Sequence, residues 1–254
     1  LRTELEATLT IWARDMLRFS REPSRVVGSL AQPLLFWLVI GTGIGSTFQP
    51  RSFPEEFSYL GFFYPGIIGL TLLFTSIFST ISVISDREHG FLREILVSPA
   101  SRGSIVMGKI LAGTTLAVAQ GSLLVLLAPL AGLTLSLGAF LQILVIMTAV
   151  SMGLTALGFT FAWRMNSVQG FHVVMNFLLF PMWLLSGAMF PLHGVPGLMR
   201  SLMYLNPLTY GIDAMRGLLA PPGQLPPGFV QLPPLLSLCM AVAFTVALIL
   251  LAPA

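Results

Sequence analysis

The sequence predicts an all-α membrane protein with six transmembrane helices, and two observations support this fold class. Hydrophobic residues make up 55% of the 254 residues, charged residues only 9%, and the mean hydropathy is +0.87. In soluble domains roughly a quarter of the residues are charged. Charged side chains are also absent from five long runs, residues 26–50, 57–85, 110–163, 165–199 and 217–254.

The lengths of these runs predict where the helices cross the membrane. A span needs about 20 apolar residues, so the 110–163 run must hold two helices, joined at the proline- and glycine-rich segment 128–138. The predicted spans are residues 26–48, 58–84, 106–129, 138–162, 168–190 and 235–253. Ten of the 13 lysine and arginine residues then fall on one side, which predicts that this side, with both termini, is cytoplasmic.

Residues 1–24 are predicted to form an interfacial helix before the first span. Leu5, Leu9, Trp12, Met16 and Phe19 recur at helical spacing, whereas the charged side chains of the segment point elsewhere. Such a helix lies in the membrane surface. A solvated helix that packs on a partner fits the same pattern.

Residues 85–104 form a charged loop between the second and third spans. Ser85 is placed to cap a short helix and Pro99 to end it, and Phe91 and Leu96 belong to its apolar side. A helix of this kind fits a docking surface for another protein, and it also fits an ordinary loop.

Residues 103–109 match most of a phosphate-binding loop, G-x-x-x-x-G-K-[ST]. Ile110 stands where a magnesium-binding hydroxyl is needed, and no buried strand precedes the segment. We therefore expect this chain to bind no ATP itself.

Two spans carry polar stripes at helical spacing. Such groups either bond to their own and neighbouring helices or form the wall of a substrate path, and the sequence leaves both open. Gln120 and Gln142, each alone, fit a structural role. The candidate path residues are Thr71, Thr75, Ser79 and Ser82 of the second span and Gln169, His172 and Asn176 of the fifth.

Residues 190–234 are predicted to form a re-entrant helical hairpin and a connector at the outer surface. Two short helices, 195–205 and 209–219, are separated by the turn signal Asn206-Pro207. Asp213 and Arg216, three residues apart, can pair on one helix face. Six prolines in residues 220–234 predict an extended connector.

Neither a metal site nor an intramembrane hydrolase is expected. The histidines His89, His172 and His193 lie in different segments, and the lone Cys239 lies in the last span. No set of serine, histidine and aspartate can be assembled at membrane depth.

Two segments carry a resemblance to a known family. The loop DREHGFLREILVSPASRGSIVMGK and the segment MFPLHGVPGLMRSLMYLNPLTYGIDAMRGLL resemble the signatures of the membrane permease subunits of ABC-2 type exporters, which include drug, lipid and lipo-oligosaccharide exporters. The resemblance covers nearly the whole chain, so it implies a single transmembrane domain over residues 1–254.

The resemblance implies that ATP and magnesium are bound by a separate ABC ATPase subunit and that this chain binds no cofactor. Two ATPase copies and a second permease copy, identical or paralogous, are implied, together with membrane lipid and without nucleic acid. The compact half-transporter form indicates a bacterial inner membrane. The loop would be a coupling helix seated in the ATPase, with Asp86, Arg87, Glu88, Gly90, Phe91, Arg93, Glu94, Leu96 and Pro99 as candidate coupling residues. The external hairpin would be marked by Asn206, Pro207, Tyr210, Asp213 and Arg216.

The expected function is ATP-driven export of a hydrophobic or amphipathic substrate by alternating access. In the family, path residues come mainly from the second and fifth spans, which agrees with the polar stripes. The alternative is a non-transport membrane scaffold or sensor with an ATPase partner.

Overall fold

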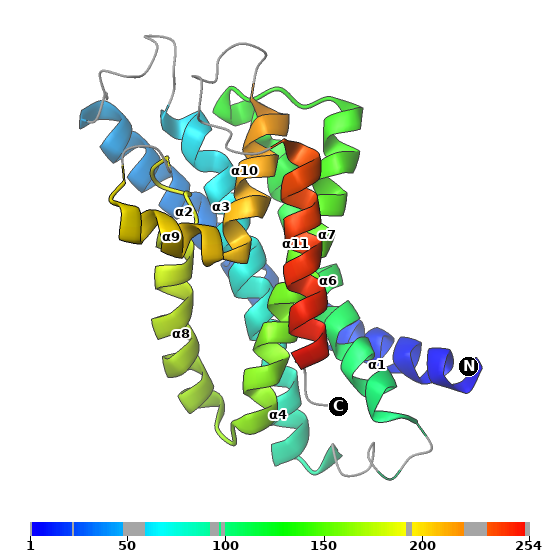
Figure 1. Ribbon diagram of the computed structural model, residues 1–254. Helices are drawn as coiled ribbons and strands as arrows, with labels where there is room; N and C mark the ends of the chain where they lie inside the picture. Colours follow the sequence, from blue (N-terminus) through cyan, green and yellow to red (C-terminus); the bar gives the residue numbers. More distant parts are fainter. Residues whose placement is uncertain are drawn as a thin grey trace.

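The computed structural model describes residues 2–21, 23–47, 59–91, 97, 100–191, 195–220 and 233–251. Every regular element in these residues is helical, as Figure 1 shows, so the all-α prediction is confirmed. The helices are α1 (Arg2–Ser20), α2 (Pro23–Thr47), α3 (Tyr59–Ser79), α4 (Ile81–Glu88), α6 (Arg102–Leu127), η1 (Ala128–Ala131), α7 (Leu137–Arg164), α8 (Val168–Leu184), α9 (Gly197–Leu205), α10 (Pro207–Leu219) and α11 (Pro234–Leu251).

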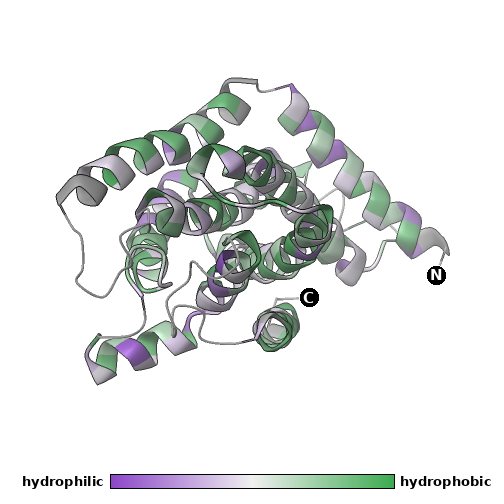
Figure 2. Ribbon diagram, turned by 90° about the horizontal axis from the view of Figure 1, so that it is seen from above, coloured by the Kyte–Doolittle hydropathy of each residue, from purple (hydrophilic) through white to green (hydrophobic). Residues whose placement is uncertain are grey.

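Within the part of the chain that the structure describes, three helical stretches are long and apolar enough to cross a membrane. They are Tyr59–Glu88, Arg102–Ala131 and Leu137–Arg164, at the second, third and fourth predicted spans. Shorter apolar helices, Val27–Gly43, Val168–Leu184 and Leu235–Leu250, stand at the first, fifth and sixth. Hydrophobic residues predominate along the helices of the bundle (Figure 2), and many of the large ones are exposed. Phe177 of α8, for example, is 85% exposed, as a side chain facing lipid would be.

Helix α3 forms the centre of the bundle and is buried along residues 61–73. It packs on α2, α6, α7, α8 and α10. Tyr64 donates a hydrogen bond to the carbonyl of Leu124 at 2.7 Å, and Trp183 donates to the carbonyl of Gly66 at 2.8 Å. These two bonds fix α3 against α6 and α8.

The connections between helices follow the proline and glycine pattern. The predicted turn at residues 128–138 is confirmed, since η1 is followed by Gly132 with φ +76°. Helix α1 ends at Ser20 and α2 begins at Pro23, a residue that suits the first turn of a helix. In Figure 1, α1 runs across the lower end of the bundle while α3, α6, α7 and α11 run along it.

The two short helices predicted between residues 195 and 219 are confirmed as α9 and α10. Asn206 caps α10 by accepting a hydrogen bond from the amide of Leu208 at 3.1 Å, and Pro207 is the first residue of that helix. The connector predicted at residues 220–234 lies mostly outside the described residues, which resume at Pro233.

The predicted helix start at Ser85 is wrong. Helix α4 runs from Ile81 to Glu88, so Ser85 lies inside it and the chain turns only at Gly90, with φ +78°. The physical reason is that Val83 and Ile84 are buried in the core, so the chain stays helical beyond the end of α3. Asp86 therefore lies near the end of a helix and not at its start.

Candidate functional site

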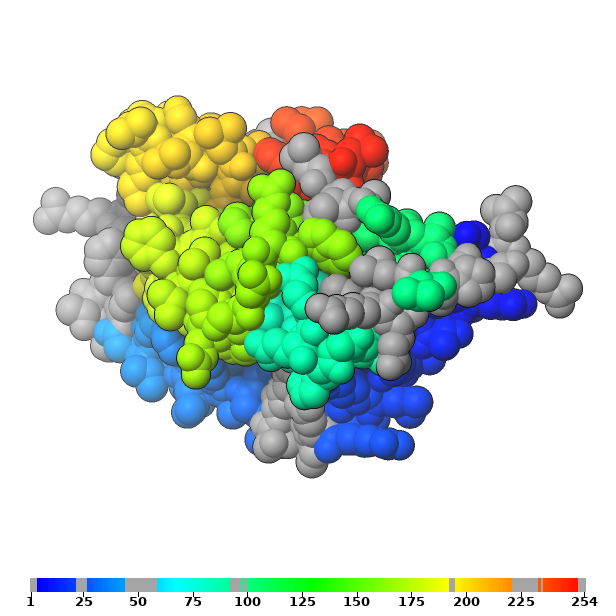
Figure 3. Space-filling model, turned by 90° about the horizontal axis from the view of Figure 1, so that it is seen from below, coloured from blue at the N-terminus to red at the C-terminus, as the bar shows by residue number. Residues whose placement is uncertain are grey.

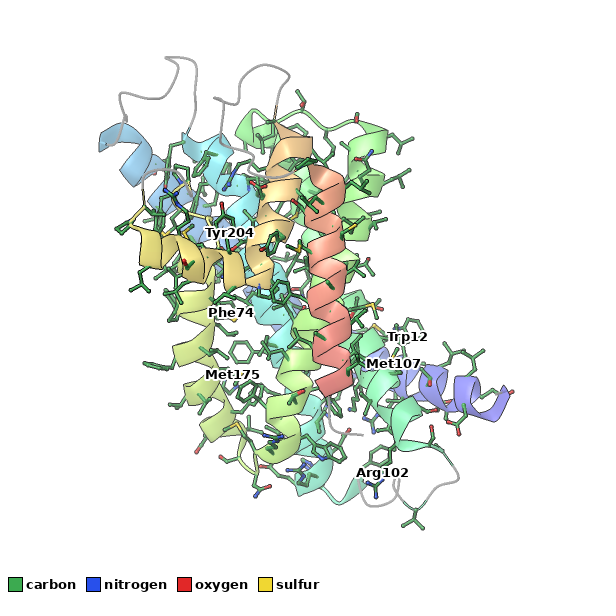
Figure 4. The ribbon with its side chains drawn as sticks, viewed as in Figure 1. Trp12, Phe74, Arg102, Met107, Met175 and Tyr204 are labelled. Carbon is green, nitrogen blue, oxygen red and sulfur yellow. The ribbon has the colours of Figure 1, made fainter. Side chains whose placement is uncertain are left out.

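A cavity of about 640 Å³ lies among α2, α3, α6 and α8, with the end of α1 at its edge. Its lining combines phenylalanine rings with uncharged polar groups, and none of the described residues that line it carries a formal charge. Phe74 lies in this space between α8 and the central helices (Figure 4). The aromatic lining is Phe19, Phe36, Phe74, Phe78 and Phe180, and the polar lining is Ser29, Gln32, Thr71, Thr75, Ser79, Gln120, His172 and Asn176.

Most of the candidate path residues meet in this cavity. Thr71, Thr75 and Ser79 line it from α3, and His172 and Asn176 line it from α8. Gln169 is exposed and Ser82 bonds elsewhere, so neither belongs to the described lining. That a substrate passes here stays a prediction.

The polar stripe bonds partly within the protein. Thr71 and Ser79 donate to carbonyls of their own helix at 3.1 and 2.7 Å. Thr75 instead donates to the side-chain oxygen of Gln120 at 2.6 Å, joining α3 to α6. From the sequence, Gln120 was predicted to have a structural role only, and its place in the cavity lining was missed. The signal in the sequence was a single polar residue within an apolar span, which needs a polar partner or water.

A cluster of buried charges lies at the α4 end of the bundle, and we name it the ionic junction: Arg14 and Asp15 of α1, Ser82 and Asp86 of α4, and Lys109 of α6. The ammonium of Lys109 donates to Asp86 at 2.7 Å, to Asp15 at 2.9 Å and to Ser82 at 3.0 Å. The lysine side chain is 3% exposed, and the two carboxylates are 7 to 8% exposed.

Arg14 closes the ionic junction from the outside. Its guanidinium donates to Asp15 at 2.8 Å and to Asp86 at 2.5 Å, and it lies 4.3 Å from the centre of the Phe91 ring. Burial opposes the charge on Asp15, but Lys109 and Arg14 outweigh it and hold the pKa of this carboxyl below its ordinary value.

This pKa shift predicts how attachment of α1 depends on pH. Because the folded-state pKa of Asp15 is lowered, its contribution to stability is fully present above roughly pH 4 and is lost as the pH falls through the lowered value. Arg14 and Lys109 pair directly with the Asp15 carboxyl. Asp86 shares both of these cations, and Arg18 lies 3.7 Å from Asp86. We expect thermal stability in detergent to stay flat from pH 7 to 5 and to drop below roughly pH 4.

The variant Asp15→Asn is the matched control for this prediction. Its stability should be lower at neutral pH and should change less between roughly pH 4 and pH 3. Equal slopes for the two proteins in that window would contradict the assignment.

Helix α1 also packs along α6 beyond the ionic junction. Glu4 accepts hydrogen bonds from the Ser101 hydroxyl at 2.6 Å and from the Ser104 hydroxyl, and Trp12 donates to the Thr115 hydroxyl at 3.1 Å. Trp12 lies against α6 in Figure 4. Helix α1, the predicted interfacial helix, is therefore fixed to the third predicted span along much of its length.

The candidate coupling residues fall into two groups. Arg93, Glu94, Leu96 and Pro99 lie outside the described residues. Asp86, Arg87, Glu88, Gly90 and Phe91 are described at the end of α4, which lies between α1 and the α7–α8 connection on the lower face (Figure 3).

Arg87 fixes the end of α4 to the connection between α7 and α8. It donates to the carbonyls of Trp163 and Met165 at 2.5 and 2.8 Å, and to the side chain of Asn166 at 2.9 Å. The end of α4 is thus held on one side by this connection and on the other by the ionic junction.

Some of the residues predicted to mark the external hairpin join α9 and α10 to each other and to the end of α8. Arg216 is 3% exposed, donates to the carbonyl of Gly187 at 2.8 Å and lies 4.1 Å from the centre of the Phe62 ring. Tyr210 donates to the carbonyl of Tyr204 at 2.7 Å, and Asp213 is buried.

A helical bundle with apolar outward faces, an uncharged cavity and a charged end defines a multi-pass membrane protein. Residues 6–220 match the family described as ABC-2 type transporter. The chain belongs to this family of membrane permeases, whose members lack an ATPase domain and pair with an ABC ATPase.

Individual relatives agree with this assignment. The chain is 31% identical over 210 residues to a putative transport permease, ycf38, of Cyanophora paradoxa, covering 80% of this chain and 70% of the relative. It is 31% identical over 221 residues to the ycf38 protein of Pyropia yezoensis, covering 84% and 72%. It is 26% identical over 211 residues to nodulation protein J of Rhizobium leguminosarum bv. viciae, covering 82% and 80%.

Proposed function

We propose that this permease exports a hydrophobic or amphipathic substrate, such as a drug, a lipid or a lipo-oligosaccharide, by ATP-driven alternating access. The observation that carries the proposal is the 640 Å³ cavity, in which uncharged polar groups oppose phenylalanine rings. Such a lining suits a molecule with an apolar body and a hydrogen-bonding head. The ycf38 relatives are named as transport permeases, which supports a transport role.

The path from the coupling loop to the cavity is short. Thr71, Thr75 and Ser79 lie on α3, and the same stretch of chain continues through α4 to Asp86. Closure of the ATPase dimer would displace the loop after α4, and α3 would carry this movement to the cavity wall. The cavity then opens on the other side, and its affinity for substrate changes.

The assembly we propose contains two permease copies and two ATPase copies, with ATP and magnesium bound on the ATPases. The loop at residues 85–104 and the interfacial helix face the ATPases on the cytoplasmic side, as both chain termini do. The hairpin and connector at residues 190–234 lie on the outer side of a bacterial inner membrane.

Transport in proteoliposomes tests the proposal. The permease is reconstituted with its ATPase, and ATP-dependent movement of a fluorescent phospholipid is measured. Thr75→Val and Asn176→Leu are expected to raise the half-saturating substrate concentration about two- to tenfold, the effect of one lost hydrogen bond.

Thr148→Val is the matched control, because Thr148 is exposed on α7 and bonds only to its own helix among the described contacts. It should leave transport unchanged. An assembled complex that hydrolyses ATP but moves none of a lipid, a cationic drug and a glycolipid would favour the scaffold or sensor instead.

A further inference from the structure

Lys109 is the shared partner of two carboxylates that come from two different helices. Asp15 belongs to α1 and Asp86 to α4, and both accept hydrogen bonds from the same ammonium. Arg14 also bonds to both carboxylates. Two cations and two anions therefore share hydrogen bonds at one site, and Arg18 lies 3.7 Å from Asp86 as a third cation. Each of the three helices supplies at least one of these charges.

The ionic junction lies where the coupling loop begins and ends. Asp86 lies in the last turn of α4, where the loop begins, and Lys109 lies near the start of α6, where the loop has ended. The ionic junction thus closes the base of the loop. It also joins α1, a helix that is not adjacent to the loop in the sequence, to the two ends of the loop.

Stability alone accounts poorly for such a cluster. Well-packed apolar side chains of similar volume often stabilise a protein as much as a buried ion pair or more. The charged groups instead fix the relative positions of the helices, because Lys109 can hydrogen-bond to both carboxylates only when the three helices keep one arrangement. Sliding of α1 or α4 by one turn would leave charges buried and unpaired, at high cost.

We propose that Lys109 is a positioning residue for energy coupling. By joining Asp15 and Asp86 it makes α1 and the two ends of the coupling loop move as one unit, so that displacement of the loop reaches α3 and α6 together. The inference rests on the proposed transport function and adds to it the residues that transmit the movement.

Variants of Lys109 test the inference in reconstituted vesicles with the ATPase present. Lys109→Met is expected to lower the number of substrate molecules moved per ATP hydrolysed by about tenfold or more, whereas Lys109→Arg keeps most of this ratio. Arg164→Met removes an exposed cation at the end of α7 and should leave the ratio unchanged. A wild-type ratio in Lys109→Met overturns the inference.

A variant without the two carboxylates separates coupling from folding. Asp15→Asn/Asp86→Asn/Lys109→Met removes both carboxylate–lysine pairs at once. It therefore lacks the two buried carboxylates that the single variant leaves without their lysine, while Arg14, whose side chain is 31% exposed, can turn to solvent. We expect this variant to co-purify with the ATPase, while the number of substrate molecules moved per ATP hydrolysed stays low. Recovery of the wild-type ratio in this variant would mean that the ionic junction serves folding only, and would overturn the inference.

A cross-link tests the same unit without disturbing the ionic junction. Thr8 and Ser104 are in contact, with the Thr8 hydroxyl 3.3 Å from the Ser104 carbonyl. In a Cys239→Ala background, Thr8→Cys and Ser104→Cys are joined by a short bismaleimide. Transport should persist, because α1 and α6 move together. Transport lost only after cross-linking overturns the inference, whereas no transport by the wild type would overturn the proposed function instead.

Discussion

Replacing Arg216 by methionine is expected to lower the free energy of unfolding by about 3–5 kcal/mol, the cost of breaking a buried ionic arrangement by removing one partner. Arg216 is 3% exposed and shares α10 with the buried Asp213. The variant removes the nearby positive charge from Asp213, the donor to the Gly187 carbonyl and the cation over the Phe62 ring.

The measurement is unfolding of the purified protein in mixed detergent micelles. Asp213→Asn/Arg216→Met should recover part of the loss, because the carboxylate is then neutral as well. Arg200→Met is the control, since Arg200 is exposed on α9 and should change stability by no more than about 0.5 kcal/mol.

A change of less than about 1 kcal/mol in Arg216→Met would contradict this account. It would mean that water reaches the guanidinium, and that the hairpin of α9 and α10 is held to α8 by other contacts. The Asn206 bond to the Met182 carbonyl and the Thr209 bond to the Leu185 carbonyl are the alternatives.

The features that sequence predicted well are those set by local chemistry. Long charge-free runs place the apolar helices, proline with glycine places the turn at residues 128–138, and Asn206-Pro207 places the break between α9 and α10. Each of these signals acts within a few residues of the chain. Their positions therefore follow from the sequence without knowledge of which helices are neighbours.

The ionic junction could not be found in this way, because its members are far apart in the chain. Lys109 is 94 residues from Asp15 and 23 from Asp86. On local pattern Asp15 is one polar residue of an amphipathic helix, and Lys109 is the last cation before a span. Only the packing of α1 on α6 brings the charges together.

Helical spacing predicted the positions of only some residues in the polar stripe of the second span. Thr71, Thr75 and Ser79 continue one face of α3, and all three line the cavity. The regular helix is interrupted between Ser79 and Ile81, so Ser82 does not extend that face. It hydrogen-bonds with Asp15 and Lys109 in the ionic junction instead.

The resemblance of residues 103–109 to a phosphate-binding loop also has a structural explanation. Lys109 belongs to the ionic junction, and Gly108 lies where α1 crosses α6. A Cβ atom at Gly108 would stand 2.9 Å from the carbonyl oxygen of Thr8 and 2.9 Å from the Cβ of Ile11. Glycine is needed here for helix contact and not for a phosphate.

Gly108→Ala is therefore expected to displace α1 and to destabilise the protein by about 1–3 kcal/mol, the usual cost of overpacking. Shortening Ile11 should rescue little, because the Thr8 carbonyl is part of the α1 backbone. The loss should appear as a lower unfolding midpoint in detergent and as faster tryptic cleavage at Arg14 and Arg18 of α1.

Gly103→Ala is the matched control on the same helix. Its new Cβ would meet only the Ser101 hydroxyl, at an ordinary 3.7 Å, and alanine favours the helix over glycine by up to about 1 kcal/mol. This variant should be as stable as the wild type or more stable, with α1 equally protected from trypsin. If the two glycine variants behaved alike, α1 would not be held against α6 at this crossing. The ionic junction and the hydrogen bonds of Glu4 and Trp12 would then hold α1, and Lys109→Met should expose α1 to trypsin more than Gly108→Ala does.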